Sequence, residues 1–266
     1  MNNVKSEHDF LVFTSAGNNS NLKEWVKGKP NFDLWITYYG EKGSLYEEVS
    51  PFYCRRSDGK FPNLHDLYTS NPGFLQQYKA IFVMDDDIEI STEEINELFE
   101  IQQEYNLWAL QPSFDEHGKI SHRITRQTPG YYMRYCNFIE MTCPLFRTDK
   151  LLDFLDVFDP ALKGWGTDYW FMDSMGDDLK YKVAVVDSIS CLNPKDCSKP
   201  GGGREIDKLQ TTDDRKVIWK RIADKYNIPL EGRSKKTFYK MRRKNSVILS
   251  FLIWVSTRMN KVRKGE

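Results

Sequence analysis

Several common features are missing from this 266-residue sequence, and each absence excludes a class of protein. The five cysteines show no paired C-x-x-C spacing, which argues against a zinc site or a disulfide framework. The longest apolar run lies at 247–255 and is far shorter than the ~20 residues that cross a bilayer. Residues 1–9 are polar and lack a basic-then-apolar signal sequence, so we expect the body of the protein in the cytoplasm.

Charge is present in both signs but is unevenly distributed along the chain. Residues 233–266 contain eleven Lys and Arg and one acid, which leaves 27 bases and 37 acids for the rest. The C-terminal tail therefore carries about +10 and the body about −10, although the formal net charge is +0. The content of 40% hydrophobic residues is typical of a globular protein.

Apolar strands and amphipathic helices alternate over the first 110 residues. This alternation favours an α/β fold, a single Rossmann-like nucleotide-binding domain that we expect to cover residues 1–228. We predict strands at 10–15, 34–39, 80–84, 107–110, 138–146 and 182–186. We predict helices at 22–26, 92–105 and 150–158, and a further helix after a tight loop at 164–168.

Three consecutive carboxylates, Asp85, Asp86 and Asp87, follow the buried strand at 80–84 and give the clearest functional signal. Parallel strands present functional groups at their carboxyl ends, where a ligand crevice can form. Carboxylates this close repel one another unless a cation lies between them. The sequence therefore indicates a divalent metal with oxygen ligands, whose coordination shell a substrate phosphate would complete.

A structural alternative is that the three acids simply form a turn before the next helix. That helix, however, has its own capping box in Ser91 and Glu94, so it does not need the carboxylates for its start. A functional role for residues 85–87 is therefore the better interpretation.

Three further side chains are candidates for contact with a substrate. Asp168 stands beside Trp165 in a partly apolar setting that suits a general base, although it could instead cap the following helix. Glu140 falls inside an apolar segment, so we expect a partner such as an Arg or a substrate hydroxyl. His122 lies in the basic stretch 121–126 and could bind a phosphate, or be an idle surface histidine.

An ordered set of motifs resembles a little-characterised family of plant and bacterial glycosyltransferase-like proteins. The motifs are Asp85-Asp86-Asp87, Leu110-Gln111-Pro112-Ser113, Ser121-His122, Asn137-Phe138-Ile139-Glu140-Met141, Pro144-Leu145-Phe146, Gly164-Trp165-Gly166-Thr167-Asp168 and Val186-Asp187-Ser188. The resemblance covers roughly residues 10 to 203. It implies a GT-A-type fold with a mixed central sheet and binding of a nucleotide-sugar donor.

The resemblance also implies roles for individual residues. Asp85 and Asp87 would match the D-x-D that binds the sugar nucleotide and a Mn²⁺ or Mg²⁺ ion, with Asp87 the direct metal ligand. Asp168 would match the base that removes the proton of the acceptor hydroxyl in inverting enzymes. The remaining donor positions would be Thr14, Ser15, Ala16, Gly17, Asp33, Lys60 and Asp86. The positions facing the acceptor or its phosphate would be Glu140, His122 and Trp165.

One position departs from the family's pattern. Asn193 stands where the resemblance leads us to expect a histidine as a further metal ligand. Its carbonyl oxygen can still bind Mg²⁺ or Mn²⁺, but the imidazole nitrogen is lost. A catalytically degenerate, membrane-attached subunit that binds a nucleotide sugar is therefore an open alternative. A nucleotidyltransferase is another, although no glycine-rich phosphate loop followed by lysine is present.

The C-terminal tail, residues 229–266, is predicted to be a basic amphipathic helix. Its apolar run at 247–255 lies between basic clusters at 235–244 and 258–264, which fits a helix in the interface of an anionic membrane. A packed helix or a dimer contact is the structural alternative, and the acidic body disfavours nucleic acid.

The combined prediction is a peripheral protein on the cytoplasmic face of the membrane. It would be an inverting, metal-dependent glycosyltransferase that passes a sugar to a glycan or glycolipid acceptor in cell-surface polysaccharide biosynthesis.

Overall fold

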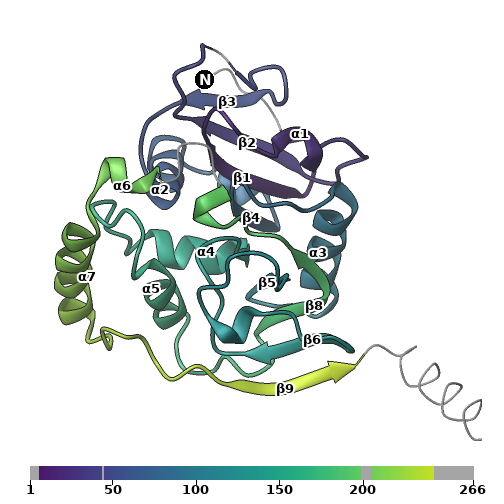
Figure 1. Ribbon diagram of the computed structural model, residues 1–266, viewed down its shortest axis with the longest axis vertical. Coiled ribbons are helices and arrows are strands. Elements are labelled where there is room, and N and C mark those ends of the chain that lie inside the picture. Colours follow the sequence, from purple (N-terminus) through teal and green to yellow (C-terminus); the bar gives the residue numbers. More distant parts are fainter. Residues whose placement is uncertain (1–5, 44, 199–204, 243–266) are drawn as a thin grey trace, which may run out of the picture.

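The computed structural model describes residues 6–43, 45–198 and 205–242 (Figure 1). The described residues form nine strands: β1 Phe10–Ala16, β2 Asp33–Tyr38, β3 Phe52–Arg55, β4 Ala80–Asp85, β5 Ala109–Phe114, β6 Tyr131–Cys136, β7 Leu145–Arg147, β8 Val183–Cys191 and β9 Thr237–Arg242. The α-helices are α1 Leu22–Trp25, α2 Lys60–Ser70, α3 Thr92–Glu104, α4 Thr148–Leu155, α5 Thr167–Ser174, α6 Ile206–Leu209 and α7 Thr212–Tyr226. Short 3₁₀ turns lie at Leu75–Gln77, Arg123–Thr125 and Asp196–Ser198.

All nine strands join one mixed sheet in the order β3-β2-β1-β4-β7-β5-β8-β6-β9. β1 lies between β2 and β4 and is parallel to both, with Ser15 beside Asp85 at the carboxyl ends. The chain winds from β1 towards β2 and β3 on one side and reaches β4 on the other. Ligands of open α/β sheets bind at such a switch point, so the topology places Asp85–Asp87 where a donor site is expected.

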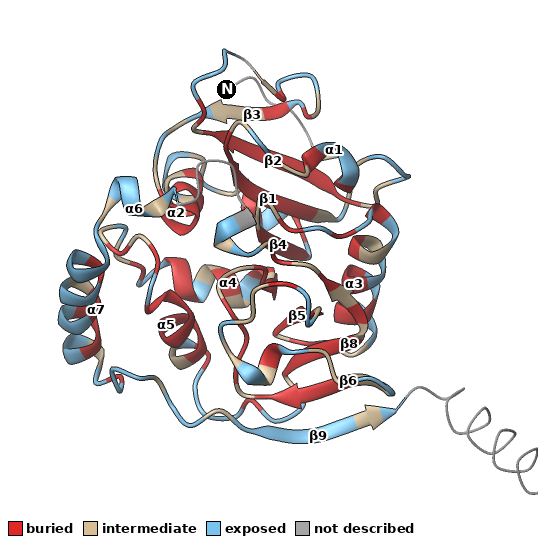
Figure 2. Ribbon diagram, viewed as in Figure 1, coloured by how far each residue is buried: buried red, intermediate tan, exposed pale blue. Residues whose placement is uncertain are grey.

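Helices cover both faces of the sheet and enclose one apolar cluster on each side (Figure 2). The cluster on one face includes side chains from α2, α4, α5 and α7, and the cluster on the other includes side chains from α1 and α3. Strand residues 11–13 are fully buried and alternate between the two clusters. This two-sided burial explains why the central strands are continuous apolar runs rather than alternating ones.

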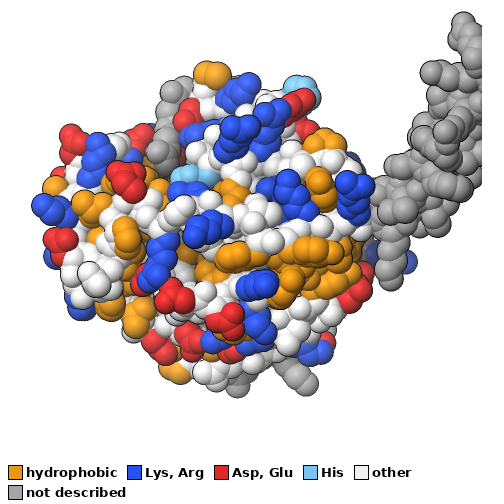
Figure 3. Space-filling model, turned by 90° about the horizontal axis from the view of Figure 1, so that it is seen from below, with side chains coloured by type: hydrophobic (Ala, Val, Ile, Leu, Met, Phe, Trp, Pro, Cys, Tyr) orange, Lys and Arg blue, Asp and Glu red, His pale blue; other side chains and the backbone are white. Residues whose placement is uncertain are grey.

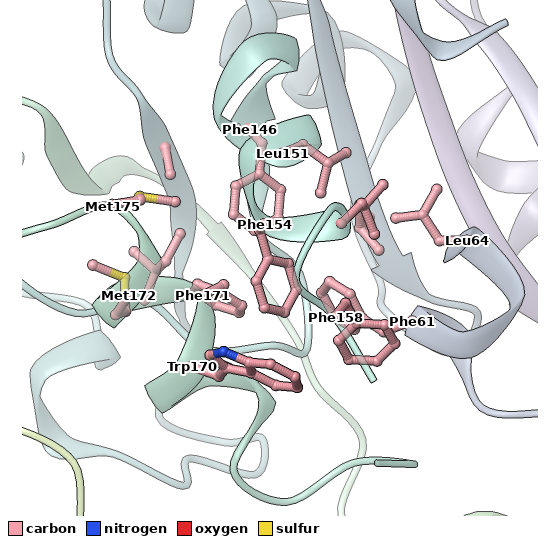
Figure 4. Close-up of a cluster of buried hydrophobic side chains, with 14 of the residues drawn as sticks. Phe61, Leu64, Phe146, Leu151, Phe154, Phe158, Trp170, Phe171, Met172 and Met175 are labelled. Atoms are coloured by element: carbon pink, nitrogen blue, oxygen red, sulfur yellow. The ribbon is translucent and has the colours of Figure 1, made fainter. Parts of the chain in front are cut away.

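α5, which carries the predicted base Asp168, is anchored by aromatic packing (Figure 4). Trp170 and Phe171 lie against Phe154 of α4 at ring-centroid distances of 5.7 and 5.9 Å. Phe61 of α2 joins the same cluster at 6.0 Å from Phe154. Because buried aromatic side chains leave little room to shift, this cluster holds the first turn of α5 in place relative to α2 and α4.

The predicted strand at 138–146 is wrong in extent. Only β7, Leu145–Arg147, is strand there, and residues 137–144 form an irregular segment after β6. Phe138 and Ile139 are nevertheless buried in the core cluster, which is why their sequence resembles a strand. β6, Tyr131–Cys136, was missed, because residues 113–135 were interpreted as one polar stretch although its end is rich in tyrosine.

The C-terminal region differs from the predicted helix. β9, Thr237–Arg242, pairs antiparallel with β6 and forms the edge of the sheet, so residues beyond 228 contribute a strand to the domain. The apolar run at 247–255 lies outside the described residues. Among the residues that are described, no helix combines the length and the apolar character needed to cross a membrane.

The turn before α5 supplies a stability prediction. Gly166 has φ +100°, and a Cβ added there would overlap the indole of Trp219 on α7. Gly176 has a comparable φ of +79°, but a Cβ there would meet nothing within 4 Å. We expect Gly166→Ala to lower the free energy of unfolding by about 1 to 3 kcal/mol more than Gly176→Ala, measured by urea denaturation. Equal losses would show that Trp219 adds no constraint at this turn.

Candidate active site

The first part of the candidate site is an ion pair at the carboxyl end of β4. Lys60, at the start of α2, places its Nζ 2.7 Å from Asp85 Oδ1. The same ammonium donates hydrogen bonds to the carbonyl oxygens of Met141 at 2.7 Å and Thr142 at 2.8 Å. Only 6% of the Lys60 side chain is exposed, so a buried cation holds the first of the three carboxylates in place.

Asp86 faces β1 rather than solvent. Its Oδ2 accepts a hydrogen bond from the backbone N–H of Gly17 at 2.8 Å. The pKa of Asp86 is raised to about 8, chiefly by burial and also by the nearby charges of Asp87 and Asp85, while the hydrogen bond from Gly17 opposes the shift. Tyr39 packs against the same glycine, since a Cβ at Gly17 would lie 2.8 Å from the Tyr39 hydroxyl. Gly17 is thus required for the close approach of β1, Tyr39 and Asp86.

The second part of the site joins Asp168 to His122. Asp168 lies in the first turn of α5 and is 8% exposed, with Oδ2 3.6 Å from His122 Nε2. Its Oδ1 accepts a hydrogen bond from the N–H of Tyr169 at 3.0 Å. Gly166, not Asp168, is the N-cap residue of α5, so the capping alternative is wrong. The His122 ring rests edge-on against Phe138 at 4.7 Å, which orients the imidazole towards Asp168.

Glu140 lies behind this pair and is 2% exposed. Its Oε1 accepts hydrogen bonds from the Thr125 hydroxyl and from the N–H of His122, the latter at 3.2 Å. The strand expected at Glu140 is wrong, because the residue lies in the irregular segment. Its partners within the protein are a hydroxyl and a backbone amide, and contact with a substrate hydroxyl stays a prediction. Burial raises its pKa to about 7, because the hydrogen bonds and His122 offset only part of the desolvation.

One short segment connects the two parts. Residues 140–142 run from Glu140, beside His122, to Thr142, whose carbonyl accepts hydrogen bonds from Lys60 and from the N–H of Asp85 at 2.9 Å. The three aspartates and Asp168 therefore share one wall of the protein. The segment thus links parts of the chain that lie more than 80 positions apart, and their joint role in one site stays a prediction.

Trp165 borders the Asp168 side of the site and is 40% exposed. Lys163, two residues before Trp165, is tied to the segment that precedes α2, because its Nζ lies 2.6 Å from Asp58 Oδ1. A large aromatic ring that stays exposed next to a buried carboxylate is suited to stacking on a sugar ring.

Three predicted donor residues do not contact the site. Asp33 is at the amino end of β2, paired with Leu11 rather than Ser15, which places it about 13 Å along the strand from Asp85. Its carboxylate accepts hydrogen bonds from the Tyr78 hydroxyl and from the N–H of Glu7. Thr14 and Ala16 are fully buried, with 0% of their surface exposed, and the Thr14 hydroxyl donates a hydrogen bond to the carbonyl oxygen of Met84. These side chains build the sheet instead of facing a ligand.

Asn193 lies close to the carboxylates, as the resemblance implied. The backbone bridge between Glu89 and Leu192 brings it alongside Ile88, next to Asp87. Asn193 is 6% exposed, and its backbone carbonyl accepts a hydrogen bond from the backbone N–H of Lys119 at 2.7 Å. Its role as a metal ligand stays a prediction.

Two residues that sequence reasoning missed lie beside the end of β1. Asn63 donates a hydrogen bond from Nδ2 to Ser15 Oγ at 2.8 Å and so ties α2 to the end of β1. Tyr39 follows the carboxyl end of β2 and packs on Gly17. The position of Tyr39 directly after a parallel strand was the available signal; Asn63 had none.

The carboxylates at the end of β4 fit a divalent ion by the chemistry of their oxygen donors. Among the described residues, no group of three or more His, Cys, Asp and Glu could by itself hold a metal. Asp85 is also engaged by Lys60. The residues present thus fit an ion of the Mg²⁺ or Mn²⁺ kind, which takes one or two carboxylates and completes its shell with water and phosphate.

A separate cavity of about 590 Å³ lies between α1 and the start of α3. Its lining includes Asn21, Glu89 and Ser91 and contains none of the predicted site side chains. The cavity nevertheless adjoins the turn of the three carboxylates, because Asn21 Nδ2 donates a hydrogen bond to the backbone carbonyl of Asp87 at 2.8 Å.

Comparisons with known proteins identify the fold. No protein-family model and no curated protein matches the chain. Solved structures do: S. aureus TarS has a TM-score of 0.51 at 10% identity, covering 80% of this chain and 43% of that one. TarS 1-349 in complex with UDP-GlcNAc has a TM-score of 0.50 at 12% identity, covering 81% and 67%. GalNAc-T7 with UDP, GalNAc and Mn²⁺ has a TM-score of 0.52 at 12% identity, covering 82% and 49%.

These structural neighbours are GT-A-type glycosyltransferases. At such low identity the likeness concerns the fold alone, and the chain spans less than half the length of TarS and of the GalNAc-T7 structure. The predicted α/β, GT-A-like fold with a mixed central sheet is confirmed.

The raised pKa of Glu140 predicts a pH dependence of stability. Below the ordinary glutamate pKa, both folded and unfolded chains hold the proton; as pH rises towards 7, the unfolded chain ionises first and the folded state loses stability. We expect urea denaturation from pH 5 to 8 to show this loss, about 3 kcal/mol, in the wild type but not in Glu140→Gln. Exposed Glu97→Gln is the control. A parallel loss in Glu140→Gln and wild type would assign the effect elsewhere.

Proposed function

We propose that this protein is a glycosyltransferase that passes a sugar from a nucleotide-sugar donor to an acceptor hydroxyl. One observation supports the proposal: three carboxylates follow β4 at the switch point of a GT-A-type sheet, and residues 140–142 link this turn to the segment beside the Asp168–His122 pair. The TarS and GalNAc-T7 structures that share this fold contain UDP-GlcNAc, or UDP, GalNAc and Mn²⁺. These neighbours support a nucleotide sugar as the donor class.

The donor side comprises residues 85–87, Gly17 and Lys60. Asp87, with Asp85, would hold Mn²⁺ or Mg²⁺, and the ion would neutralise negative charge on the departing diphosphate. Lys60 orients the Asp85 carboxylate, because its ammonium lies 2.7 Å from Asp85 Oδ1. Asp86 shapes the wall through its hydrogen bond to Gly17 instead of facing the donor.

The acceptor side performs the proton transfer. The acceptor oxygen forms a bond to the anomeric carbon as the bond from that carbon to the diphosphate oxygen breaks, and the electron pair leaves with the diphosphate. Asp168 Oδ2 takes the hydroxyl proton, since it is mostly buried and its other oxygen is held by Tyr169 N–H. His122 keeps the carboxylate in position, and Trp165 offers an exposed ring to the acceptor sugar. A single displacement of this kind inverts the anomeric centre.

The cellular setting belongs to the same proposal. A glycan or glycolipid acceptor in cell-surface polysaccharide synthesis, on the cytoplasmic face of the membrane, fits the basic and apolar sequence of residues 243–266. Within the chain's own residues, the positive charge of that segment contrasts with the acidic body and favours anionic lipid as its partner.

A donor-binding subunit without catalysis is the second candidate. Asn193 in place of a histidine and the neutralisation of Asp85 by Lys60 both favour it, since each weakens the case for a tightly held metal. Nucleotidyl transfer is distinguished by its product, because it releases pyrophosphate whereas sugar transfer releases a nucleoside diphosphate.

The first prediction tests the base. We expect Asp168→Asn to lower sugar transfer about a hundredfold to ten-thousandfold while donor affinity stays within twofold, because the amide cannot accept the proton but keeps the shape. Steady-state kinetics and calorimetry with the donor measure the two quantities. Asp178→Asn, at an exposed position just beyond α5, is the control. Undiminished transfer by Asp168→Asn would remove Asp168 from this role.

The second prediction tests the donor site and the ion. We expect one nucleotide class among UDP-, GDP- and CMP-sugars to raise the melting temperature in the presence of Mn²⁺, since binding to the folded state alone stabilises it. Asp87→Asn should abolish the part of the shift that depends on Mn²⁺. Stabilisation by donor that Mn²⁺ and Asp87→Asn both leave unchanged would contradict the metal assignment.

A further inference from the structure

The sheet edge formed by β9 carries exposed aromatic and basic side chains that the proposed site does not use. Figure 3 views the side of the molecule on which β9 lies and shows a band of hydrophobic side chains with Lys and Arg around it. Tyr181, Phe238 and Tyr239 are 48%, 39% and 50% exposed. Lys240 and Arg242 alternate with Tyr239 along β9 and so project from the opposite face of this edge strand. The exposed rim of the edge, made of Tyr181, Phe238 and Tyr239 together with Lys180, Lys240 and Arg242, is called the β9 surface.

The aromatic residues of this surface are gathered, not scattered. The rings of Tyr181 and Tyr239 lie 6.2 Å apart, and both pack on the nearly buried ring of Tyr135, at 5.1 and 6.3 Å. Lys180 Nζ lies over the Tyr181 ring at 5.2 Å. Contiguous exposed aromatic area of this kind marks an interaction surface, whereas single exposed rings do not.

The charge of the surface selects the partner. Residues 233–242 contain five Lys and Arg and no acid. Two acids beside the start of this segment, Asp173 and Asp177, are paired with Arg233 at 2.8 and 2.6 Å. Lys240 and Arg242 lie over Tyr131 at the exposed edge, where charged side chains oppose pairing with another strand. The surface is therefore complementary to an anionic partner and poorly suited to a second copy of the sheet.

The β9 surface is tied to the acceptor side of the candidate site. Just before β9, Asn137 exchanges hydrogen bonds with Lys236 at 3.1 and 2.6 Å and donates to the Ser234 carbonyl at 2.9 Å. Lys235 Nζ lies over the rings of Phe138 and Tyr169, at 4.5 and 4.9 Å. These two rings also pack around His122, so the segment leading into β9 borders the Asp168 side of the site.

We propose that the β9 surface docks on the anionic headgroup layer of a membrane. Tyrosine places an apolar ring and a polar hydroxyl at such an interface, and Lys and Arg attract anionic lipid. The chain continues from Arg242 into residues 243–266, which hold six Lys and Arg, one acid and the apolar run at 247–255. Docking there brings the acceptor side of the site to the lipid, and in this respect the inference rests on the proposed function.

The test measures vesicle binding alone, so its outcome is independent of sugar transfer. Full-length protein is sedimented with phosphatidylcholine vesicles with or without about 30 mol% phosphatidylserine. We expect binding to the anionic vesicles that weakens with added salt. Tyr181→Ser/Tyr239→Ser should lower the partition coefficient about tenfold, and Lys240→Gln/Arg242→Gln about fivefold per charge.

Matched controls lie on α7, away from β9. Val217→Ser removes a side chain that is 70% exposed, and Lys216→Gln/Lys220→Gln makes the same charge change. Both should bind as the wild type does, and unchanged melting temperatures confirm that every variant is folded. Absence of binding by the wild type, or equal losses in β9 and α7 variants, overturns the proposal. So does a dimer that dissociates in Tyr181→Ser/Tyr239→Ser, since the surface would then join two copies of the chain.

Discussion

The buried ammonium of Lys60 is the interaction on which the candidate site depends. It lies against the Asp85 carboxylate and the carbonyl oxygens of Met141 and Thr142, so one cation joins the start of α2, the end of β4 and the segment that leads from Glu140. Burying a lysine is costly unless its donors are all satisfied, and here the acceptors converge on it. That cation offsets the charge of the first of three adjacent carboxylates, which would otherwise add to the repulsion among them.

The two parts of the site are stabilised by different physical means. The donor side relies on charge, since Lys60 compensates Asp85 and the N–H of Gly17 holds Asp86. The acceptor side relies on packing, because the aromatic cluster under α5 positions Asp168 and the ring of Phe138 positions His122. In the proposed function, the charged residues around Asp85 would accommodate an ion or a phosphate, and the packing around α5 would keep the Asp168 carboxylate fixed for proton transfer.

The C-terminal segment connects the edge of the sheet with the region around Asp168. The stretch that carries Lys235 passes over Phe138 and Tyr169 before β9 joins the sheet, so the edge strand and the acceptor side form one continuous region. In the proposed docking, a strand in this position would fix the orientation of Asp168 relative to the membrane, whereas a flexible linker would not.

Local sequence was sufficient for the central strands, the capping box at Ser91 and the carboxylate cluster, because each depends on neighbouring residues alone. It failed for Asp33, Glu140 and β9. The position of Asp33 relative to the proposed site depends on the register between β2 and β1, which local sequence does not show. A buried segment such as 138–140 resembles a strand whether or not it pairs with one. Only the tertiary structure decided that Lys60 would neutralise Asp85 and that His122 would meet Asp168, since such contacts join residues far apart in the chain, and their energy exists only after the sheet has assembled.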